Sequence, residues 1–201
     1  MKPVFPGIWS WSWYSDEKHI DFNGHYLVVG EHRILVDPPP MSNEDKAQLR
    51  RDGRPDYIVL TNRDHTREAQ ALKTEFGARL YVPEADAPEM TGVEPDKTYR
   101  DGELLPGGIW AVQLRDQKSK GESALFLEKA PGVLILGDAL IGKQVGVLSM
   151  LAAEKYADAG RARDGLRRLL NYKFDAVLVG DGYSITKGGK AAVEHVINFS
   201  S

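Results

Sequence analysis

The chain has 201 residues, which one domain can accommodate, and we expect a single domain over 1–201. Hydrophobic residues make up 42% and charged residues 27% of the sequence, a balance typical of a globular protein and unlike that of a disordered chain. The formal net charge of −3 offers no basic field to attract nucleic acid or an anionic membrane. We therefore expect a small-molecule substrate, no nucleic acid and no membrane, and the oligomeric state stays open.

The absence of cysteine narrows the chemistry that the chain can perform. It excludes disulfides, thiolate metal sites and a cysteine nucleophile, so that a metal would have to be held by His, Asp or Glu. Prolines and polar residues interrupt the apolar runs near the start, and no later run approaches the roughly 20 apolar residues of a membrane-spanning helix. We expect a cytoplasmic protein.

The first segments predict an antiparallel meander. Trp9, Trp11 and Trp13 alternate with polar residues, which predicts a strand that carries the three indoles on one buried face. Asn23-Gly24 is a typical turn dipeptide, and the apolar runs that follow it have the length of strands. We therefore predict a turn at Asn23-Gly24 and further strands after it.

A helix, a strand and a second helix are expected next. Three prolines after Asp37 end the meander, and Ser42 is a preferred cap for a helix that reaches about Arg51. The apolar run 57–60 is typical of a strand covered on both faces, and the helical pattern after it stops at Gly77. The order is strand, polar loop, helix.

The second half of the chain repeats this alternation. A hairpin is expected from the apolar runs 124–127 and 133–136, followed by a helix over 158–171. The run 176–179 predicts another buried strand, and 189–199 a last amphipathic helix.

Three of these apolar strands end in acidic loops. Asp64-His65 follows the first, Asp138 the second and Asp181 the third. Loops at strand ends commonly carry functional residues in scaffolds of this kind. If the three loops converge, their like charges need a cation to neutralise them, so convergence predicts a bound metal.

The order of these loops resembles the metallo-β-lactamase superfamily over nearly the whole chain. The family begins with a meander that carries Asn-x-Tyr-Leu and Val-Asp, for which the chain has Asn23, Tyr26-Leu27 and Val36-Asp37. The family's strand ending in Gly-Asp-Ala is present as Gly137-Asp138-Ala139, and family members use that aspartate to bridge two metals. The resemblance implies an α+β protein, a four-layered αββα sandwich with metal-dependent hydrolase activity.

The metal-binding motifs of the family are incomplete in this chain. The family's Thr-His-x-His-x-Asp-His stretch corresponds to Thr61-Asn62-Arg63-Asp64-His65, which is shorter by two residues and lacks the first two histidines. Lys118 and Asp181 stand where the family has its later two histidines. The resemblance therefore implies that the first metal site is lost and that Asp64, His65, Asp138 and Asp181 form the second.

One divalent metal ion follows from this comparison. Three of its four expected ligands are carboxylates, which favours Mn, Fe or Mg slightly over Zn. We expect Asp64 and Lys118 to be catalytic, with the Lys118 ammonium replacing part of the lost metal's charge beside Asp138.

Other interpretations stay open at this point. A non-catalytic family member would bind a small molecule or a partner in the altered pocket, with no metal, and an iron-dependent redox variant would need a domain for electron delivery. Locally, Asp64 has the character of a helix cap, and Asp138 and Asp181 that of turn residues. The near phosphate-loop sequence at Gly137–Gln144 lacks the required hydroxyl, which disfavours nucleotide binding.

Overall fold

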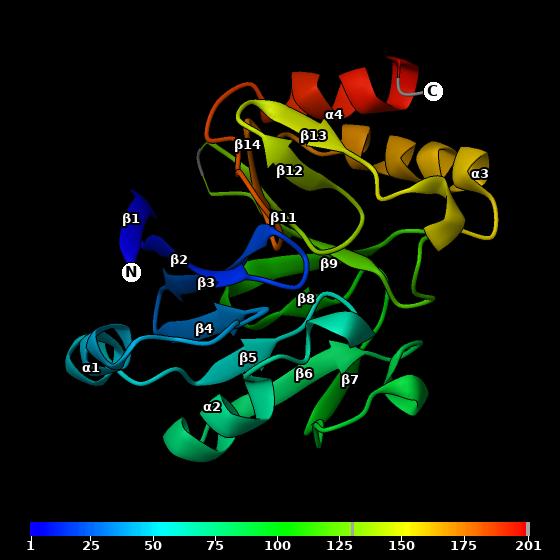
Figure 1. Ribbon diagram of the computed structural model, residues 1–201. Coiled ribbons are helices and arrows are strands. Elements are labelled where there is room, and N and C mark those ends of the chain that lie inside the picture. The colour runs from blue at the N-terminus through cyan, green and yellow to red at the C-terminus, as the bar shows by residue number, and fades with distance from the viewer. Residues whose placement is uncertain (130, 200–201) are drawn as a thin grey trace.

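The computed structural model describes residues 1–129 and 131–199. Two β-sheets face each other, and helices cover the outer face of each (Figure 1). This is the four-layered αββα arrangement that the sequence predicts, and the α+β class is confirmed. In the described part of the chain, none of the helices combines the length and apolar character that crossing a membrane requires.

The first sheet contains seven strands in chain order. The first four are antiparallel neighbours, and the later ones pair in parallel. The strands are β1 (Lys2–Phe5), β2 (Ile8–Ser15), β3 (Ile20–Val29), β4 (His32–Val36), β5 (Tyr57–Val59), β6 (Arg79–Pro83) and β7 (Lys97–Tyr99).

The second sheet contains five strands in the order β14-β11-β10-β9-β8. Only β11 and β14 are parallel, so their carboxyl ends meet at one edge. The strands are β8 (Leu104–Leu105), β9 (Ile109–Gln113), β10 (Ser123–Leu127), β11 (Val133–Leu136) and β14 (Ala176–Val179), and β12 (Ile141–Gln144) and β13 (Val147–Ser149) form a separate hairpin.

The helices lie where the predicted patterns place them. The Ser42 hydroxyl accepts from the Asp45 N–H and caps α1 (Asn43–Asp52), as expected. The expected helix over 158–171 is α3 (Ala159–Gly165) followed by a 3₁₀ segment, Leu166–Asn171. The two remaining α-helices are α2 (Ala69–Phe76) and α4 (Gly189–Phe199).

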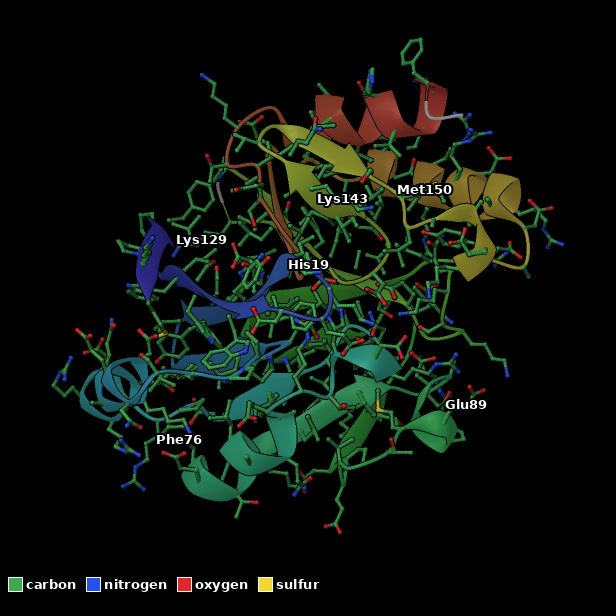
Figure 2. The ribbon with its side chains drawn as sticks, in the orientation of Figure 1. His19, Phe76, Glu89, Lys129, Lys143 and Met150 are labelled. Atoms are coloured by element: carbon green, nitrogen blue, oxygen red, sulfur yellow. The ribbon has the colours of Figure 1, made fainter. Side chains whose placement is uncertain are left out.

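Three apolar cores hold the layers together. Between the sheets, Leu27 and Ile34 pack with Leu125, Ile135 and Leu178, and these side chains are almost completely buried. Side chains fill the space between the two sheets (Figure 2). The outer face of the first sheet packs on α1 and α2, and that of the second sheet on the 3₁₀ segment Leu166–Asn171 and on α4. Burial on both faces explains why strands such as β5 and β14 are continuously apolar.

The predicted turn at Asn23-Gly24 is wrong, because both residues lie inside β3. Gly24 pairs with Trp11 of β2, and a Cβ at Gly24 would lie 2.3 Å from the Trp11 indole. Glycine is needed here for a close side-chain approach and not for a turn.

The prediction of three buried indoles is correct for Trp11 and wrong for Trp13, which is 50% exposed. From Ser12 to Tyr14 the side chains of β2 are exposed, so the far half of the β2–β3 hairpin extends beyond the packed layers. Strand alternation predicts a shared face, but it does not predict how far the cover over that face reaches.

His25 of β3 is completely buried and has a titratable ring inside the sandwich. Its Nδ1 lies 2.8 Å from the Ser10 hydroxyl oxygen. Burial lowers the pKa of His25 from 6.5 to about 4, and the nearby Asp37 charge only partly opposes this. The folded protein therefore favours the neutral imidazole.

Acid should destabilise the fold through His25. The unfolded side chain takes up a proton near pH 6.5, and the folded one resists until about pH 4, so stability falls as the pH drops through this window. The loss attributable to His25 is on the order of 3 kcal/mol. Urea unfolding at a series of pH values measures this. The free energy of unfolding should depend less steeply on pH in His25→Gln than in the native protein. His195→Gln, on the exposed side of α4, should match the native slope. Equal slopes for native and His25→Gln proteins would contradict this assignment.

Candidate functional site

Three loops that leave the sheets at strand ends form one cluster of ligand-type side chains. His65 follows β5, Asp138 follows β11 and Asp181 follows β14. One nitrogen or oxygen atom from each lies within 4.8 Å of the others. His65 and Asp138 are buried, and Asp181 is partly exposed. The convergence of the strand ends is thus present, and the cluster could hold a metal ion.

Asn23 fixes the loop that carries Asp181. Its side-chain nitrogen donates to the carbonyls of Val179 (2.9 Å) and Gly182 (2.6 Å), and its oxygen accepts from the Ser12 hydroxyl (2.7 Å). Gly182 has φ of +84°, which favours glycine, and a Cβ there would lie 2.2 Å from the Gly142 carbonyl oxygen. The meander of the first sheet therefore positions a loop of the second.

Asp37 orients His65 from behind. This fully buried carboxylate accepts from the Thr61 N–H (2.8 Å) and hydroxyl (2.5 Å), and it lies 2.8 Å from His65 Nδ1. Burial opposes the ionised form, but His65 and the two Thr61 hydrogen bonds outweigh it and lower the pKa of Asp37. With Nδ1 engaged in this way, His65 presents Nε2 to Asp138, 3.4 Å from its carboxylate.

The charges around His65 strongly affect its protonation. Burial and the Arg67 guanidinium oppose a proton, but Asp37 and Asp138 outweigh them and raise the pKa of His65 from 6.5 to about 10. Burial also opposes ionisation of Asp138, yet His65 and Lys118 lower the pKa of this carboxyl well below its usual range. Without a bound ion, the cluster is an imidazolium among carboxylates.

Lys118 bridges two of the predicted site residues. Its Nζ lies 2.6 Å from an Asp138 oxygen and 2.9 Å from an Asp64 oxygen. Burial alone would lower the pKa of Lys118, but Asp138 and Asp64 raise it, so the side chain stays a cation at neutral pH. The ammonium therefore lies between the carboxylates of Asp64 and Asp138.

Asp64 does not join the cluster of three donors. Its side chain is 40% exposed and pairs with Lys118 instead. It is not a helix cap either, because the Asn62 side chain caps this 3₁₀ turn by accepting from the Asp64 N–H (2.8 Å). The structure thus brings His65, Asp138 and Asp181 together and places Asp64 across Lys118 from them.

Arg67 lies inside the cluster, although the sequence analysis assigns it no role. Its Nη2 lies 2.6 Å from an Asp181 oxygen and 3.3 Å from His65 Nε2, and its guanidinium stacks on the Phe22 ring at 4.1 Å. Arg67 comes two residues after His65 in the same polar loop. Only the structure shows that it reaches Asp181, in the loop that follows the last strand, β14.

Glu122 and Asn62 form a second buried polar group beside the cluster. Burial and the Asp138 charge raise the pKa of Glu122 well above its usual range, which favours the protonated carboxyl. Among the described residues, Glu122 Oε2 and Asn62 Nδ2 have no hydrogen-bond partner. A Cβ at Gly137 would lie 2.6 Å from Asn62 Nδ2 and 2.9 Å from Glu122 Oε1, so both side chains depend on glycine there.

Asp86 connects the two loops that carry Asp64 and Lys118. This fully buried carboxylate accepts from the N–H groups of Arg63 (2.9 Å) and Gly121 (2.7 Å). A Cβ at Gly121 would lie 2.6 Å from the Asp86 carboxyl carbon, so glycine is needed for this contact. No motif in the sequence points to Asp86.

Comparison with known proteins places this geometry in a family. The family model described as the metallo-β-lactamase superfamily matches residues 1–199. The chain belongs to the metallo-β-lactamase superfamily. The resemblance drawn from Asn23, Val36-Asp37 and Gly137-Asp138-Ala139 is thereby confirmed.

Individual members of the superfamily and of its fold are only distantly similar. The hydroxyacylglutathione hydrolase of Brucella anthropi is 28% identical over 117 residues, which is 56% of this chain and 44% of that protein, so the match spans less than half of the relative. A metallo-β-lactamase from Pontibacter korlensis has a TM-score of 0.74 at 13% identity, with 99% of this chain and 98% of that chain covered. A protein solved in a di-iron-bound form has a TM-score of 0.70 at 18% identity, with coverage of 94% and 99%.

Removing the Asp86 carboxylate should destabilise the two loops that carry Asp64 and Lys118 without changing either of those residues. Asp86→Ala leaves two buried N–H groups unpaired, and we expect a loss of roughly 3 kcal/mol in the free energy of unfolding. Urea unfolding measures this loss. Asp56→Ala is the matched control, because exposed Asp56 also accepts from a backbone N–H, that of Arg33 at 2.9 Å, which water can replace. Equal losses in the two variants would contradict the assigned role.

Proposed function

We propose that this superfamily member is a hydrolase that uses one divalent metal ion held by His65, Asp138 and Asp181. The observation that carries the proposal is the convergence of these three donors within 4.8 Å at the strand ends of both sheets. The hydrolase name of the Brucella anthropi relative supports the reaction class. Substrates with a carbonyl or phosphoryl ester fit the proposal, because a cation acts on the oxygen of either group.

The residues present fit a divalent ion in three respects. Donors that share an ion at about 2.0 to 2.4 Å lie at most about 4.8 Å apart, which agrees with the cluster. The contact between Asp37 and His65 Nδ1 resembles the carboxylate support that metal-ligating histidines usually have. Third, a positive group already lies against two of the three donors, because the Arg67 guanidinium contacts Asp181 and His65.

Two carboxylates and one imidazole suit Mn, Fe, Mg or Zn, and the carboxylate majority favours the first three. The di-iron-bound neighbour adds support for iron. Asp64, expected as a fourth ligand, contacts Lys118 instead, and we assign it a role in proton transfer and not in metal binding.

The proposed chemistry divides between the ion and the side chains of this chain. When bound, a divalent ion supplies Lewis acidity that polarises the substrate and acidifies water. The Lys118 ammonium donates to the substrate oxygen that becomes negative, and its raised pKa keeps it protonated for this role. Asp64, whose side chain is 40% exposed, accepts the proton released by the attacking water and passes it to the oxygen of the leaving group.

A non-catalytic binding protein is the second candidate, and one observation favours it. Lys118 and Arg67 already neutralise carboxylates of the site, at 2.6 Å from Asp138 and 2.6 Å from Asp181. A pocket balanced in this way can bind a small molecule without a metal and without turnover.

Metal analysis and one variant separate the two candidates. Protein reconstituted with Mn, Fe, Mg or Zn should hold about one ion per chain by elemental analysis, and it should hydrolyse at least one ester from an acyl and phosphoryl panel. Asp138→Asn should lose the ion and reduce hydrolysis on the order of 100-fold or more. Asp158→Asn is the control, because exposed Asp158 only caps α3. Absence of bound ion and of turnover in native protein would favour the non-catalytic candidate.

The role of Lys118 can be tested against its neighbour in sequence. Lys118→Met should reduce kcat by roughly 100-fold, the size expected for loss of an oxyanion donor, while the ion stays bound. Lys120→Met removes the same charge from an exposed side chain two residues away, which pairs with Glu89, and should leave kcat within about twofold. Steady-state kinetics and elemental analysis give both quantities. A kcat close to native for Lys118→Met would contradict the catalytic role.

A further inference from the structure

Arg67 competes for the same atoms that would hold the ion. Its Nη2 lies 2.6 Å from Asp181 Oδ1 and 3.3 Å from His65 Nε2, and Asp181 and His65 are two of the three donors in the cluster. An ion bound to both donors needs the space around them in which the guanidinium now lies. A guanidinium has no acceptor atom and stays charged, so it cannot share this space with a divalent cation.

The inward position of Arg67 is well supported. Its side chain is only 9% exposed, its Nη1 donates to the Gly180 carbonyl oxygen at 3.4 Å, and its guanidinium stacks on Phe22. These contacts fix a desolvated cation against Asp181 and make it a strong competitor.

The backbone at Arg67 is strained in this position. Its φ of +30° lies in the left-handed region, which a residue with a Cβ rarely adopts. The neighbouring residues hold this conformation, because the Glu68 N–H donates to the Pro38 carbonyl (3.1 Å) and the Ala69 N–H to the Thr66 carbonyl (2.8 Å). Strain that the surroundings maintain at a functional cluster points to a role for the side chain placed there.

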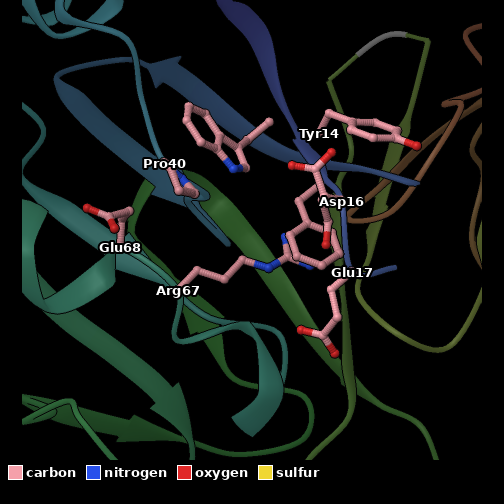
Figure 3. A pocket seen from close by; sticks show the side chains of 9 residues that line it. Tyr14, Asp16, Glu17, Pro40, Arg67 and Glu68 are labelled. Carbon is pink, nitrogen blue, oxygen red and sulfur yellow. The ribbon is translucent and has the colours of Figure 1, made fainter. Parts of the chain in front are cut away.

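An alternative position for the guanidinium lies next to the cluster. Arg67 lines a cavity of about 400 Å³ together with the carboxylate residues Asp16, Glu17 and Glu68 (Figure 3). Exposed aromatic residues of the β2–β3 hairpin, Trp13 and Tyr14, complete its wall. Glu17 already pairs with exposed Lys18 at 2.5 Å. A guanidinium that leaves Asp181 still finds space and the carboxylates of Asp16 and Glu68 within the same cavity.

We propose that Arg67 is an internal counter-cation that controls metal occupancy, and that the ion binds only when the guanidinium moves from Asp181 into this acidic cavity. The inference rests on the proposed metal site. Its thermodynamic consequence is that the measured dissociation constant equals the intrinsic one divided by the fraction of molecules with Arg67 outward. Removing the guanidinium therefore tightens metal binding without adding a ligand.

Binding of Mn²⁺ alone tests this, with free ion followed by electron paramagnetic resonance and no activity measured. Arg67→Met keeps length and removes charge, and we expect its Mn²⁺ affinity to rise roughly tenfold or more. Arg67→Lys keeps the charge and should stay closer to native. Arg50→Met is the control, because Arg50 is an exposed arginine of α1 that pairs with Glu75, and its affinity should remain native.

The acidic cavity gives a second test that does not alter Arg67 in the native background. Asp16→Asn with Glu17→Gln removes two of the three carboxylates that line the cavity and so weakens the outward position. Mn²⁺ affinity should therefore fall roughly threefold in the native chain and stay unchanged when Arg67→Met is also present. The loss of Mn²⁺ affinity in the native chain remains informative even if Arg67→Met alone folds poorly, because it does not use that variant. A double-mutant cycle with no coupling would overturn the inference.

The outcomes distinguish the inference from the function on which it rests. Tighter Mn²⁺ binding by Arg67→Met, including Mn²⁺ binding that appears only in that variant, supports the role of Arg67 as a counter-cation. Equal Mn²⁺ affinity in native protein and Arg67→Met overturns it and leaves the metal site intact. Absence of binding in both proteins overturns the metal site itself.

Discussion

The buried contact between Asp37 and His65 is the interaction on which the rest of the site depends. Asp37 lies at the end of β4 and is fully buried, so its charge persists only because Thr61 and His65 satisfy it. These partners belong to the loop after β5, and the contact therefore fixes that loop to the neighbouring strand. It also sets the direction of His65 Nε2 toward Asp138, which joins the first sheet to the second. Loss of either partner would leave an uncompensated charge in the interior.

Charge balance explains why this acidic site is stable in the fold. The carboxylates of Asp64 and Asp138 share Lys118, and that of Asp181 has Arg67. The buried acid Glu122 is pushed toward its protonated form by burial and by Asp138. Each acid is thus paired or neutralised by means within the chain, as buried ionisable groups require. A bound ion would add positive charge to a site that has already been compensated, which makes occupancy sensitive to the position of Arg67.

Patterns local in sequence account for much of the fold. The buried strands β5, β11 and β14, the Ser42 cap and the helix α4 follow from apolar runs and capping chemistry. The error at Asn23-Gly24 has a physical cause, because a glycine required by a packed indole has the same sequence signal as a glycine required by a turn.

Residues of the site that act over long sequence distances could not be found in this way. Arg67 and Asp181 are 114 positions apart, and Asp86 binds Gly121 across 35 positions. The sequence predicts that Asp138 and Asp181 each follow a strand, and only the parallel pairing of β11 and β14 in the structure brings the two strand ends together. Which cation faces which acid depends on side-chain direction. The place of the site and one of its cations, Lys118, are therefore predictable from the sequence, and Arg67 is not.

Two ion pairs of the site, Lys118–Asp64 and Arg67–Asp181, differ in burial, and this difference separates their roles. The side chains of Lys118 and Asp64 are 29% and 40% exposed, so water screens their pairing and it can rearrange when a substrate approaches. The side chains of Arg67 and Asp181 are 9% and 13% exposed, and a pair with so little water around it interacts strongly and reorganises at a higher cost. The exposed pair, Lys118–Asp64, is therefore suited to contact with a substrate. The buried pair, Arg67–Asp181, is suited to control whether a metal ion binds.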